Sequence, residues 1–216
     1  GMNDKLNINS YIDNNNFEKK VNVSSIDSNK FNISYSLNER TRAFIKIQDG
    51  CDYNCTYCTI PNARGFSRND TIAKTISKIN DIVNNNIKEI VLSGVNIGDF
   101  GASNGENLNN LLIELEKIKN LYRYRISSIE PNLINHDMIQ IFNQSSKWLK
   151  HLHIPLQSGS DKILKKMKRR YSVNLYEKKI NKLNDLFDDL CIGVDLIVGF
   201  PSESDYDFNR TYSFIE

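Results

Sequence analysis

The chain has 216 residues, with 28 Lys or Arg and 26 Asp or Glu, and its net charge of +2 provides no global field for nucleic acid or a membrane surface. This length, with 39% hydrophobic residues, is enough for one substantial core. No stretch approaches the ~18 apolar residues of a transmembrane helix, and the chain's beginning lacks the apolar core of a signal peptide. We therefore expect a soluble cytoplasmic protein with no membrane partner, where reducing conditions favour metal or catalytic cysteines over disulfides.

The first forty residues are polar and rich in Asn and Ser. Short apolar alternations within them predict a linker or a pair of leading strands, at Val21 and Val23 and at Phe31, Ile33 and Tyr35. The pattern becomes regular from Arg42 onward. We accordingly divide the chain into a leading segment, residues 1–40, and a core domain, residues 41–216.

In the core domain, strand-like runs alternate with helical patterns. The predicted strands are Ala43–Ile47, Glu89–Ser93, Tyr122–Ile129, Leu152–Leu156 and Ile192–Gly199. The predicted helices are Ile72–Val83, capped by Asn69 or Asp70, then Leu108–Ile118, Asn135–Phe142, Asp161–Met167 and Val173–Phe187. Such repeated βα units predict an α/β fold with a parallel sheet or partial barrel of about five strands. The apolar last strand, DLIVGF, predicts burial on both of its faces.

Polar and Gly-rich positions follow each predicted strand. In parallel α/β folds the carboxyl ends of the strands meet at one rim, where chemistry gathers. The residues concerned are three cysteines after the first strand, Gly94 and Asn96 after the second, Glu130 after the third, Gln157 and Ser158 after the fourth, and Gly199 to Pro201 after the fifth. We expect them to lie at the same rim.

The three cysteines after the first strand, Cys51, Cys55 and Cys58, are spaced C-x3-C-x2-C. A structural zinc site normally has four ligands, and the candidates for a fourth, His136, His151 and His153, come from other segments. Three thiolates on a four-iron cluster would leave one iron open to a substrate or cofactor. Zinc and unliganded buried thiols remain the alternatives.

The spacing and its surroundings resemble the radical S-adenosylmethionine (SAM) enzymes, whose signature C-x3-C-x-aromatic-C is matched by Cys51, Cys55, Tyr57 and Cys58. The resemblance implies a TIM-like (β/α) barrel, here truncated. It also implies that the three thiolates hold a 4Fe-4S cluster, that the open iron chelates SAM, and that the backbone beside Tyr57 contacts the adenine. Transfer of an electron from a flavodoxin- or ferredoxin-like donor would then cleave SAM and give a 5′-deoxyadenosyl radical.

Further segments are similar to the methylthiotransferase branch of that family. They are TRAFIKIQDGC, CTIPNARG, VLSGVNIGDFG, RISSIEP, HLHIPLQSGSDKILKKMKRRY and DLIVGFP. The resemblance is strongest to the enzymes that methylthiolate C2 of threonylcarbamoyladenosine next to the tRNA anticodon, which implies tRNA as a partner; we expect a monomer. Complete enzymes of this branch hold a second 4Fe-4S cluster with three more cysteines. This chain has four cysteines in all, so we expect it to be the core of a longer enzyme and unable to hold that second cluster.

The resemblance assigns cofactor contacts to several rim residues, and each also has a structural interpretation. Gly94 and Asn96 match positions near the amino group of SAM, but they would equally suit a strand-ending turn. Glu130 could hold ribose hydroxyls or be a solvated strand end. Gln157 and Ser158 stand at a helix entry suited to anions. Simple N-capping by Ser158 or Ser160 is the alternative.

A run of six positive charges, from Lys162 to Arg170, lies on an amphipathic helix. It is either a solvated face or a phosphate-binding surface for tRNA. The resemblance places Arg169 near SAM, where a guanidinium could grip a carboxylate. The roles of the lysines stay open.

Four further positions have weaker signals. Asp195 lies within an apolar strand, so we expect either a paired buried carboxylate or a contact to substrate or cofactor at the barrel mouth. His151 and His153 share one strand face and are expected to be satisfied barrel residues. Cys191 is expected to be a small buried residue. Where the family usually has FPGET, this chain has FPSES, and a turn with positive φ would resist Ser202.

Two rival functions remain at this level. One is a sister-branch methylthiotransferase acting on isopentenyladenosine in tRNA or on a ribosomal protein. The other is an RNA-binding module stabilised by zinc or a cluster, without catalysis.

Overall fold

The computed structural model describes residues 8–9, 31–36 and 41–216. Its strands are β1 (Ser34–Tyr35), β2 (Arg42–Lys46), β3 (Gln48–Asp49), β4 (Arg68–Asn69), β5 (Glu89–Ser93), β6 (Arg123–Ile126), β7 (His151–His153) and β8 (Cys191–Gly193). Its helices are α2 (Ile60–Arg64), α3 (Ile72–Asn84), α4 (Leu108–Glu116), α5 (His136–Gln144), α6 (Asp161–Lys166), α7 (Val173–Leu186) and α8 (Asp205–Ile215), with short 3-10 turns η2 (Ile97–Asp99) and η3 (Pro131–Leu133). The predicted alternation Val21 and Val23 lies outside the described residues.

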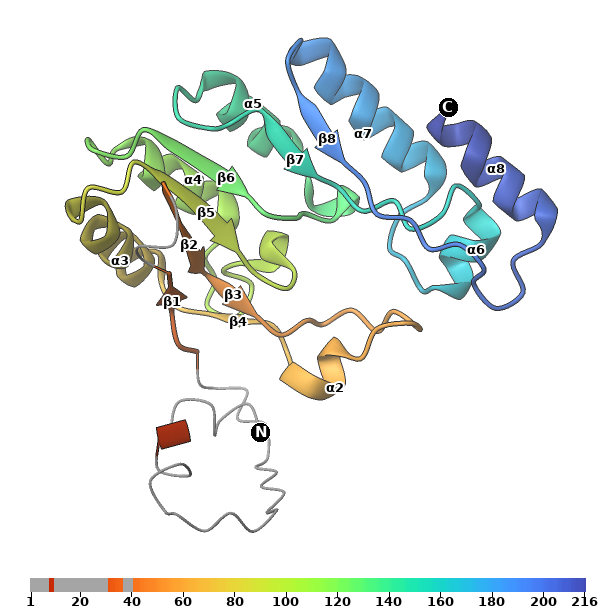
Figure 1. Ribbon diagram of the computed structural model, residues 1–216, viewed down its shortest axis with the longest axis horizontal. Helices are drawn as coiled ribbons and strands as arrows, with labels where there is room; N and C mark the ends of the chain where they lie inside the picture. Colours follow the sequence, from red (N-terminus) through yellow and green to blue (C-terminus); the bar gives the residue numbers. More distant parts are fainter. Residues whose placement is uncertain (1–7, 10–30, 37–40) are drawn as a thin grey trace.

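Five parallel strands form an open arc. β2 pairs with β5 and β5 with β6, all parallel, while β7 pairs in parallel with β8. A parallel bridge between Tyr124 and Trp148 continues the arc from β6 toward β7, and β1 adds an antiparallel strand on β2. Figure 1 shows the strands fanning across the molecule with α3, α5, α7 and α8 along the outside of the arc. The partial (β/α) barrel predicted from the sequence is confirmed, and the described strands do not close into a ring.

Side-chain caps explain where the helices begin. Asn135 caps α5 and Ser172 caps α7, each accepting a backbone N–H two or three residues into the helix, which satisfies an otherwise unpaired donor. Ser204 and Asp207 form a reciprocal capping box at α8. The cap of α3 is Thr71, whose hydroxyl accepts from the Lys74 N–H, so the prediction of Asn69 or Asp70 is wrong. Asn69 instead accepts from the Gly101 N–H at 3.0 Å.

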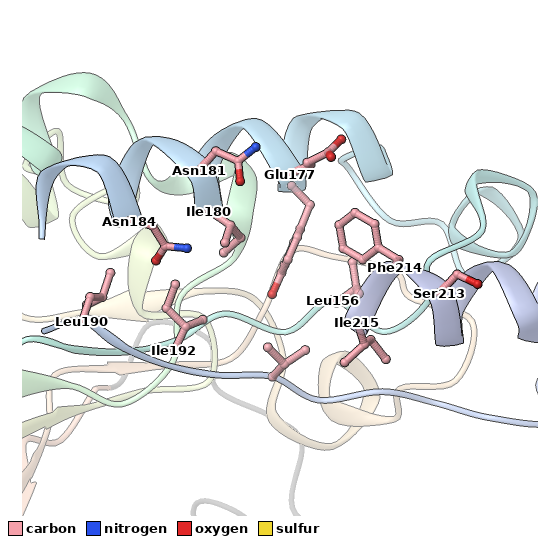
Figure 2. Close-up of a pocket in the computed structure, with 12 residues that line it drawn as sticks. Leu156, Glu177, Ile180, Asn181, Asn184, Leu190, Ile192, Ser213, Phe214 and Ile215 are labelled. Carbon is pink, nitrogen blue, oxygen red and sulfur yellow. The ribbon is translucent and has the colours of Figure 1, made fainter. Parts of the chain in front are cut away.

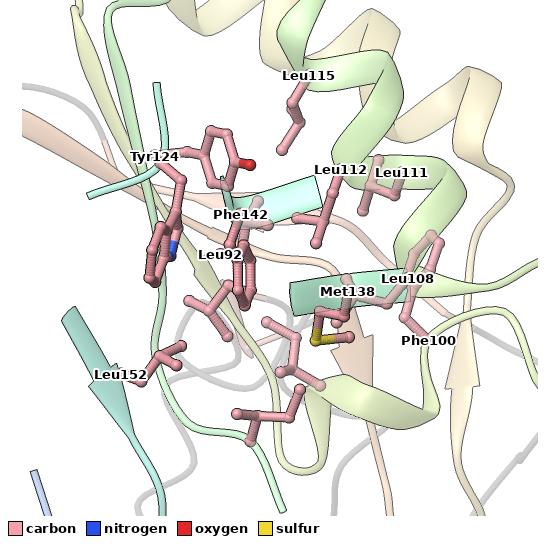
Figure 3. Packing of buried hydrophobic residues seen from close by; sticks show 14 of the residues in the cluster. Leu92, Phe100, Leu108, Leu111, Leu112, Leu115, Tyr124, Met138, Phe142 and Leu152 are labelled. Atoms are coloured by element: carbon pink, nitrogen blue, oxygen red, sulfur yellow. The ribbon is translucent and has the colours of Figure 1, made fainter. Parts of the chain in front are cut away.

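The main core lies between the sheet and the helices α4 and α5. Leu111, Leu112 and Leu115 share the inner face of α4 and are fully buried, as the spacing of three and four residues requires. Figure 3 shows them directed toward Tyr124 and Phe142, and Phe142 stacks on Trp148 with ring centroids 4.2 Å apart. This packing holds the strands in place, so the loops at their carboxyl ends start from a rigid base.

The last strand differs from its prediction. Its regular part is only Cys191–Gly193, continued by a bridge between Gln157 and Leu196, rather than Ile192–Gly199. Val194 and Val198 are 43% and 63% exposed, so the predicted burial on both faces is wrong, and Cys191 is exposed rather than buried. The physical reason is that β8 has one strand neighbour, β7, among the described residues, and its other edge is not covered.

A cavity of about 470 Å³ lies beside this strand, between α7 and α8 (Figure 2). Its lining is largely apolar and includes Tyr176, Ile180, Ile192 and Phe214. None of the cysteines at positions 51, 55 and 58 lines it. It is therefore a packing gap beside the exposed edge of the sheet and separate from the rim where the chemistry-bearing residues were expected.

The turn after β8 places a serine in a backbone conformation that favours glycine. Ser202 has φ of 71°, as the departure from FPGET anticipated, and Gly199 has φ of 74° with open space around an added Cβ. We expect Ser202→Gly to raise the free energy of unfolding by about 0.5 to 1 kcal/mol, because relief of left-handed strain exceeds the added chain entropy. Urea unfolding would measure this. Gly199→Ala, the matched reverse change, should lower it by about 1 kcal/mol; equal stabilities for all three proteins would contradict the strain argument.

Candidate cofactor site at the cysteine loop

The three clustered cysteines lie on one loop between β3 and α2. Cys55 is 8% exposed, and Cys51 and Cys58 are half-buried. The loop is tied down at both ends: the Cys51 N–H donates to the Gly65 carbonyl at 3.1 Å, and Thr56 donates through N–H and hydroxyl to the carbonyls of Met167 and Lys166. The thiols are therefore carried by an ordered backbone that is anchored to α6.

The environment of Cys51 keeps its thiol protonated. Burial raises the pKa of Cys51 to about 11, and the nearby Asp99, Cys55 and Cys58 add to this, outweighing the N–H that Tyr53 donates to its Sγ at 3.4 Å. Because a metal binds the thiolate, loading this site must release protons.

Arg169 connects the cysteine loop to the third strand end. Its side chain is 3% exposed; one terminal nitrogen donates to Cys55 Sγ at 3.2 Å and to Tyr57 Oη at 3.0 Å, and the other pairs with Glu130. Burial alone would lower the pKa of Arg169, but Glu130 reverses the effect and raises it. Arg169 thus brings together Cys55 and Tyr57, each more than a hundred positions away in the chain, with Glu130, so four of the residues expected at the site meet at one point.

Gly94 and Asn96 approach the cysteine loop from the second strand end. The Asn96 side chain is 5% exposed; its amide nitrogen donates to Asp99 at 2.6 Å, while its Oδ1 is buried without a partner in the described structure. A buried acceptor with no donor carries a desolvation cost unless a ligand supplies one. A Cβ on Gly94 would lie 2.9 Å from the Gln48 side-chain oxygen, so this backbone passes close to the loop's base.

Gln157 and Ser158 make structural contacts instead. Gln157 has φ of 65° and pairs through its backbone with Asp195 and Ile197. Ser158 is fully buried, with its hydroxyl 3.3 Å from that of Thr211 on α8. Ser160 occupies the N-cap position of α6 without a capping bond, because its hydroxyl donates to Asp207 at 2.8 Å. Capping by Ser160 is therefore wrong, and a cofactor role for Gln157 and Ser158 stays a prediction.

Asp195, His151 and His153 lie at the β7–β8 end of the sheet. The Asp195 side chain is 65% exposed, with Oδ1 3.2 Å from His153 Nε2, so it is paired but not buried. His153 also contacts the Ser128 hydroxyl at 3.0 Å. His151 differs from the expectation of a satisfied side chain, because its Nδ1 is buried with no partner among the described residues and burial lowers its pKa.

Four of the six basic residues in the run make contacts within the protein, although only the Arg169 side chain is buried. Lys162 pairs with the buried Asp207 at 2.6 Å, Lys166 bonds Ser202, and Arg169 is buried against Glu130. Arg170 donates to the Asp52 carbonyl at 3.0 Å and lies over the Tyr53 ring, 3.9 Å from its centroid. Lys162 and Lys166 therefore brace the start of α8 and the turn before it, and Arg169 and Arg170 brace the cysteine loop, while every one of these residues except Arg169 is also exposed to solvent.

Asp99 lies beside the candidate site, bonded to Asn96, and was not among the residues predicted from the sequence, because a single acid in a Gly-rich turn has no distinguishing pattern. It stands at the end of η2, and burial, with Asp52 adding to it, raises its pKa to about 6 from 3.8. A raised carboxyl pKa means that stability falls as pH rises from about 4 through about 6, where the buried group must ionise.

We expect Asp99→Asn to stabilise the metal-free protein at pH 7.5 by about 1 kcal/mol, allowing for partial exposure, and by only about a third as much at pH 4.5, where the folded-state carboxyl is still protonated. Urea unfolding at both pH values measures this. The exposed Asp188→Asn serves as the control and should change neither value. A destabilised Asp99→Asn protein at pH 7.5 would show that ionised Asp99 is stabilising and would contradict the argument.

The donor set of the loop fits an iron–sulfur cluster. Three free thiols from one loop are the ligand type that such clusters prefer. Among the described residues, no three or more His, Cys, Asp or Glu side chains are already gathered to hold a metal ion, so the fit rests on the ligand type and the shared loop.

Comparison with known proteins places the chain in a family. Residues 45–215 match the family model of the radical SAM superfamily, which is most of the chain. The chain belongs to the radical SAM superfamily. This confirms the resemblance drawn from the cysteine spacing, and it makes the 4Fe-4S cluster and SAM the family's expected cofactors.

The curated relatives of this radical SAM chain are named as methylthiotransferases. Threonylcarbamoyladenosine tRNA methylthiotransferase MtaB of Thermotoga maritima is 38% identical over 100% of the chain and 50% of its own length. MtaB of Bacillus subtilis is 40% identical over 84% of the chain and 41% of its own length. The tRNA-2-methylthio-N(6)-dimethylallyladenosine synthase of Lawsonia intracellularis is 36% identical over 80% of the chain. The chain therefore spans half or less of the length of each of these relatives.

Solved structures of radical SAM proteins share the fold. TsrM from Kitasatospora setae, a methyltransferase solved with cobalamin and a [4Fe-4S] cluster, has a TM-score of 0.66 over 80% of this chain and 34% of its own, at 14% identity. OxsB, a cobalamin-dependent radical enzyme, has a TM-score of 0.66 over 80% of this chain and 26% of its own, at 13% identity. In the part of the chain that the structure describes, no helix has the length and apolar character needed to cross a bilayer.

Proposed function

We propose that this chain is the radical SAM domain of a tRNA methylthiotransferase, which modifies C2 of threonylcarbamoyladenosine next to the anticodon. The observation that carries the proposal is the meeting of the cysteine loop with Arg169, which places a buried cation, paired with Glu130, against the thiol of Cys55. Similarity to the MtaB proteins over the whole chain supports the choice of substrate.

In this proposal the chain's own residues bind and orient two cofactors. Cys51, Cys55 and Cys58 would hold a 4Fe-4S cluster, and Arg169, which contacts Cys55, offers a guanidinium there that suits a carboxylate. When bound, the cluster supplies the electron that cleaves SAM. Burial of Cys55 and Arg169 excludes water from this point, which strengthens the electrostatic contacts made there.

Five further residues are proposed to contact SAM or the substrate. The backbone beside Tyr57 would contact the adenine, and Gly94 and Asn96 would contact the amino group of SAM. Glu130 would either bind the ribose hydroxyls or serve only as the partner of Arg169. Asn96 has a buried oxygen without a partner, which is the kind of atom that an ammonium donor would satisfy. Asp195 is exposed at the strand end and open to a substrate.

The proposal extends to partners. A flavodoxin- or ferredoxin-like donor would supply the electron, tRNA would be the substrate, and the protein would act as a cytoplasmic monomer. A second 4Fe-4S cluster would be held by cysteines outside this chain, since three of its four cysteines are in the loop and the fourth, Cys191, is alone on β8.

Anaerobic reconstitution of the chain tests the cofactor part. We expect about four irons per chain and formation of 5′-deoxyadenosine when the reduced protein is given SAM. Tightly held zinc without iron uptake would overturn the proposal, and tRNA binding without 5′-deoxyadenosine would favour a non-catalytic RNA-binding module.

Nucleoside analysis of tRNA from cells that lack the parent gene tests the substrate. Loss of the methylthio group from threonylcarbamoyladenosine is the expected result. Its loss from isopentenyladenosine instead would favour the sister branch, to which the chain is 36% identical in the L. intracellularis synthase.

A further inference from the structure

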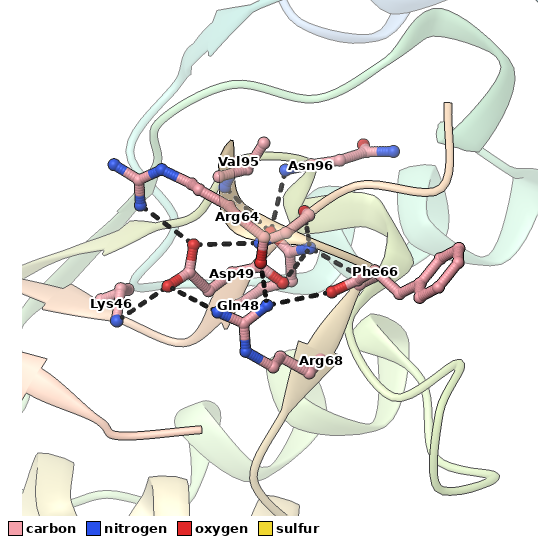
Figure 4. Close-up of polar contacts among 10 residues, drawn as sticks. Lys46, Gln48, Asp49, Arg64, Phe66, Arg68, Val95 and Asn96 are labelled. Carbon is pink, nitrogen blue, oxygen red and sulfur yellow. Dashed lines mark hydrogen bonds and ion pairs between the residues drawn. The ribbon is translucent and has the colours of Figure 1, made fainter. Parts of the chain in front are cut away.

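Gln48 is a fully buried polar residue at the base of the cysteine loop. It follows β2 and opens the short strand β3, three residues before Cys51. Figure 4 shows its side chain at the centre of polar contacts that reach Val95 and Asn96 on one side and the cysteine-loop backbone on the other. A buried amide is stable in such a place only when its donor and acceptor groups are satisfied.

The oxygen of Gln48 holds the second strand end. Its Oε1 accepts the Val95 N–H and the Asn96 N–H, each at 2.9 Å, across a sequence gap of nearly fifty residues. The same oxygen would be 2.9 Å from a Cβ on Gly94. Glycine at position 94 is therefore what allows this close approach, and the path of the Gly94–Asn96 backbone is set by one acceptor atom.

The nitrogen of Gln48 holds the cysteine loop. Its Nε2 donates to the Gly50 carbonyl at 2.8 Å and to the Ser67 hydroxyl at 2.9 Å. Gly50 directly precedes Cys51, and Ser67 lies beyond α2, where the loop returns. One side chain thus spans both ends of the cysteine loop and the neighbouring strand end.

The adjacent Asp49 holds the same loop by charge. Its carboxylate, 2% exposed, pairs with Lys46 at 3.1 Å, with Arg64 of α2 at 2.9 Å and with Arg68 of β4 at 3.4 Å. Burial would raise the pKa of Asp49, but the bonds from Arg64 and Lys46 outweigh it and lower the pKa. Loss of Gln48 would therefore leave the cysteine loop anchored while freeing the Gly94–Asn96 backbone.

We propose that Gln48 is a positioning residue that sets the separation between the cysteine loop and the Gly94–Asn96 backbone. This rests on the proposed function, in which the loop holds the cluster and the Gly94–Asn96 backbone receives the amino group of SAM. A ligand that bridges the two segments binds well only if they are held at a fixed spacing before it arrives. Gln48 provides that spacing through two bonds to each side.

The test compares Gln48→Leu with the wild type and with Gln144→Leu, the same change at an exposed glutamine at the end of α5. In the metal-free full chain, amide hydrogen exchange of residues 94–97 should become about tenfold faster in Gln48→Leu, while the cysteine loop keeps its protection. After reconstitution, Gln48→Leu should bind the same iron as wild type. It should need about tenfold more SAM to produce the half-maximal change in the cluster's electron paramagnetic resonance spectrum.

These readouts separate positioning from simple stability. If Gln48 had a purely structural role, Gln48→Leu would lower the melting temperature. The SAM concentration for the half-maximal spectral change would then stay the same, and amide exchange would not become faster in residues 94–97 alone. That result would overturn the proposal. If Gln48→Leu fails to fold, as judged by circular dichroism, Gln48→Asn keeps the amide but is one methylene too short to bridge both segments, and it should show the same two effects.

A second variant addresses the same contact from the other side. Gly94→Ala places a methyl group against Gln48 Oε1, so in the metal-free chain its effect on the amide exchange of residues 95–97 should not add to that of Gln48→Leu, because both break one contact. Fully additive effects would contradict the proposal. Failure of the wild type to take up iron would count against the proposed function instead, and hydrogen exchange would still decide the role of Gln48 in the metal-free chain.

Discussion

Replacing Cys55 with alanine is expected to abolish assembly of the iron–sulfur cluster. Cys55 is the most buried of the three loop thiols, and it accepts a hydrogen bond from Arg169 at 3.2 Å. Its removal leaves two thiols, which cannot hold a four-iron cluster site-specifically. Reconstituted Cys55→Ala protein should contain less than about one iron per chain and show no cluster absorbance, while wild type holds about four.

The chain offers a matched control for this change. Cys191 is also a free cysteine but is exposed on β8, outside the loop. Cys191→Ala should retain the wild-type iron content. If both variants keep about four irons, the cluster is not held by the predicted loop, and if both lose them, the losses reflect damage to the fold rather than loss of a ligand.

Replacing Glu130 with glutamine should destabilise the metal-free protein by about 2 kcal/mol. Arg169 would keep its charge at 3% exposure while losing its carboxylate partner, and an unpaired buried charge is costly. The hydrogen bonds from Arg169 to Tyr57 and Tyr171 remain and limit the loss. Urea unfolding at neutral pH would measure the difference.

An exposed ion pair provides the control for this measurement. Glu114 pairs with Lys117 on α4, where both side chains are exposed, so Glu114→Gln should cost less than about 0.5 kcal/mol. Equal losses in the two variants would show that burial of Arg169 contributes nothing, and the account of Glu130 as its neutralising partner would then fail.

Much of the fold could be read from local sequence patterns. The apolar spacing along α4 and α7 and the strand Glu89–Ser93 predicted elements that the structure contains, because both depend on neighbours a few residues away. The prediction for the last strand was wrong because burial of that strand depends on distant parts of the chain. Its apolar residues indicate burial, but whether a face is covered depends on what packs there, and Val194 and Val198 are exposed.

Pairings between distant residues could not be predicted from the sequence. Lys162 and Lys166 belong to a run that reads as a solvated or tRNA-binding face, yet they bond Asp207 and Ser202 near α8. Gln48 has no pattern of its own and is recognisable only once Val95 and Asn96 are brought to it. Such contacts depend on how the chain folds back, which no short window contains.

By itself, the sequence determined the spacing of the three thiols and pointed to the family that the comparisons confirm. Thiol spacing is a covalent property of the chain, so three thiols at C-x3-C-x2-C stay within one segment of eight residues in any fold. Only the tertiary structure decided which side chains complete the site. Arg169 reaches Cys55 and is paired with Glu130, and Gln48 ties the loop to the Gly94–Asn96 backbone, because the open arc of parallel strands brings their carboxyl ends to one rim.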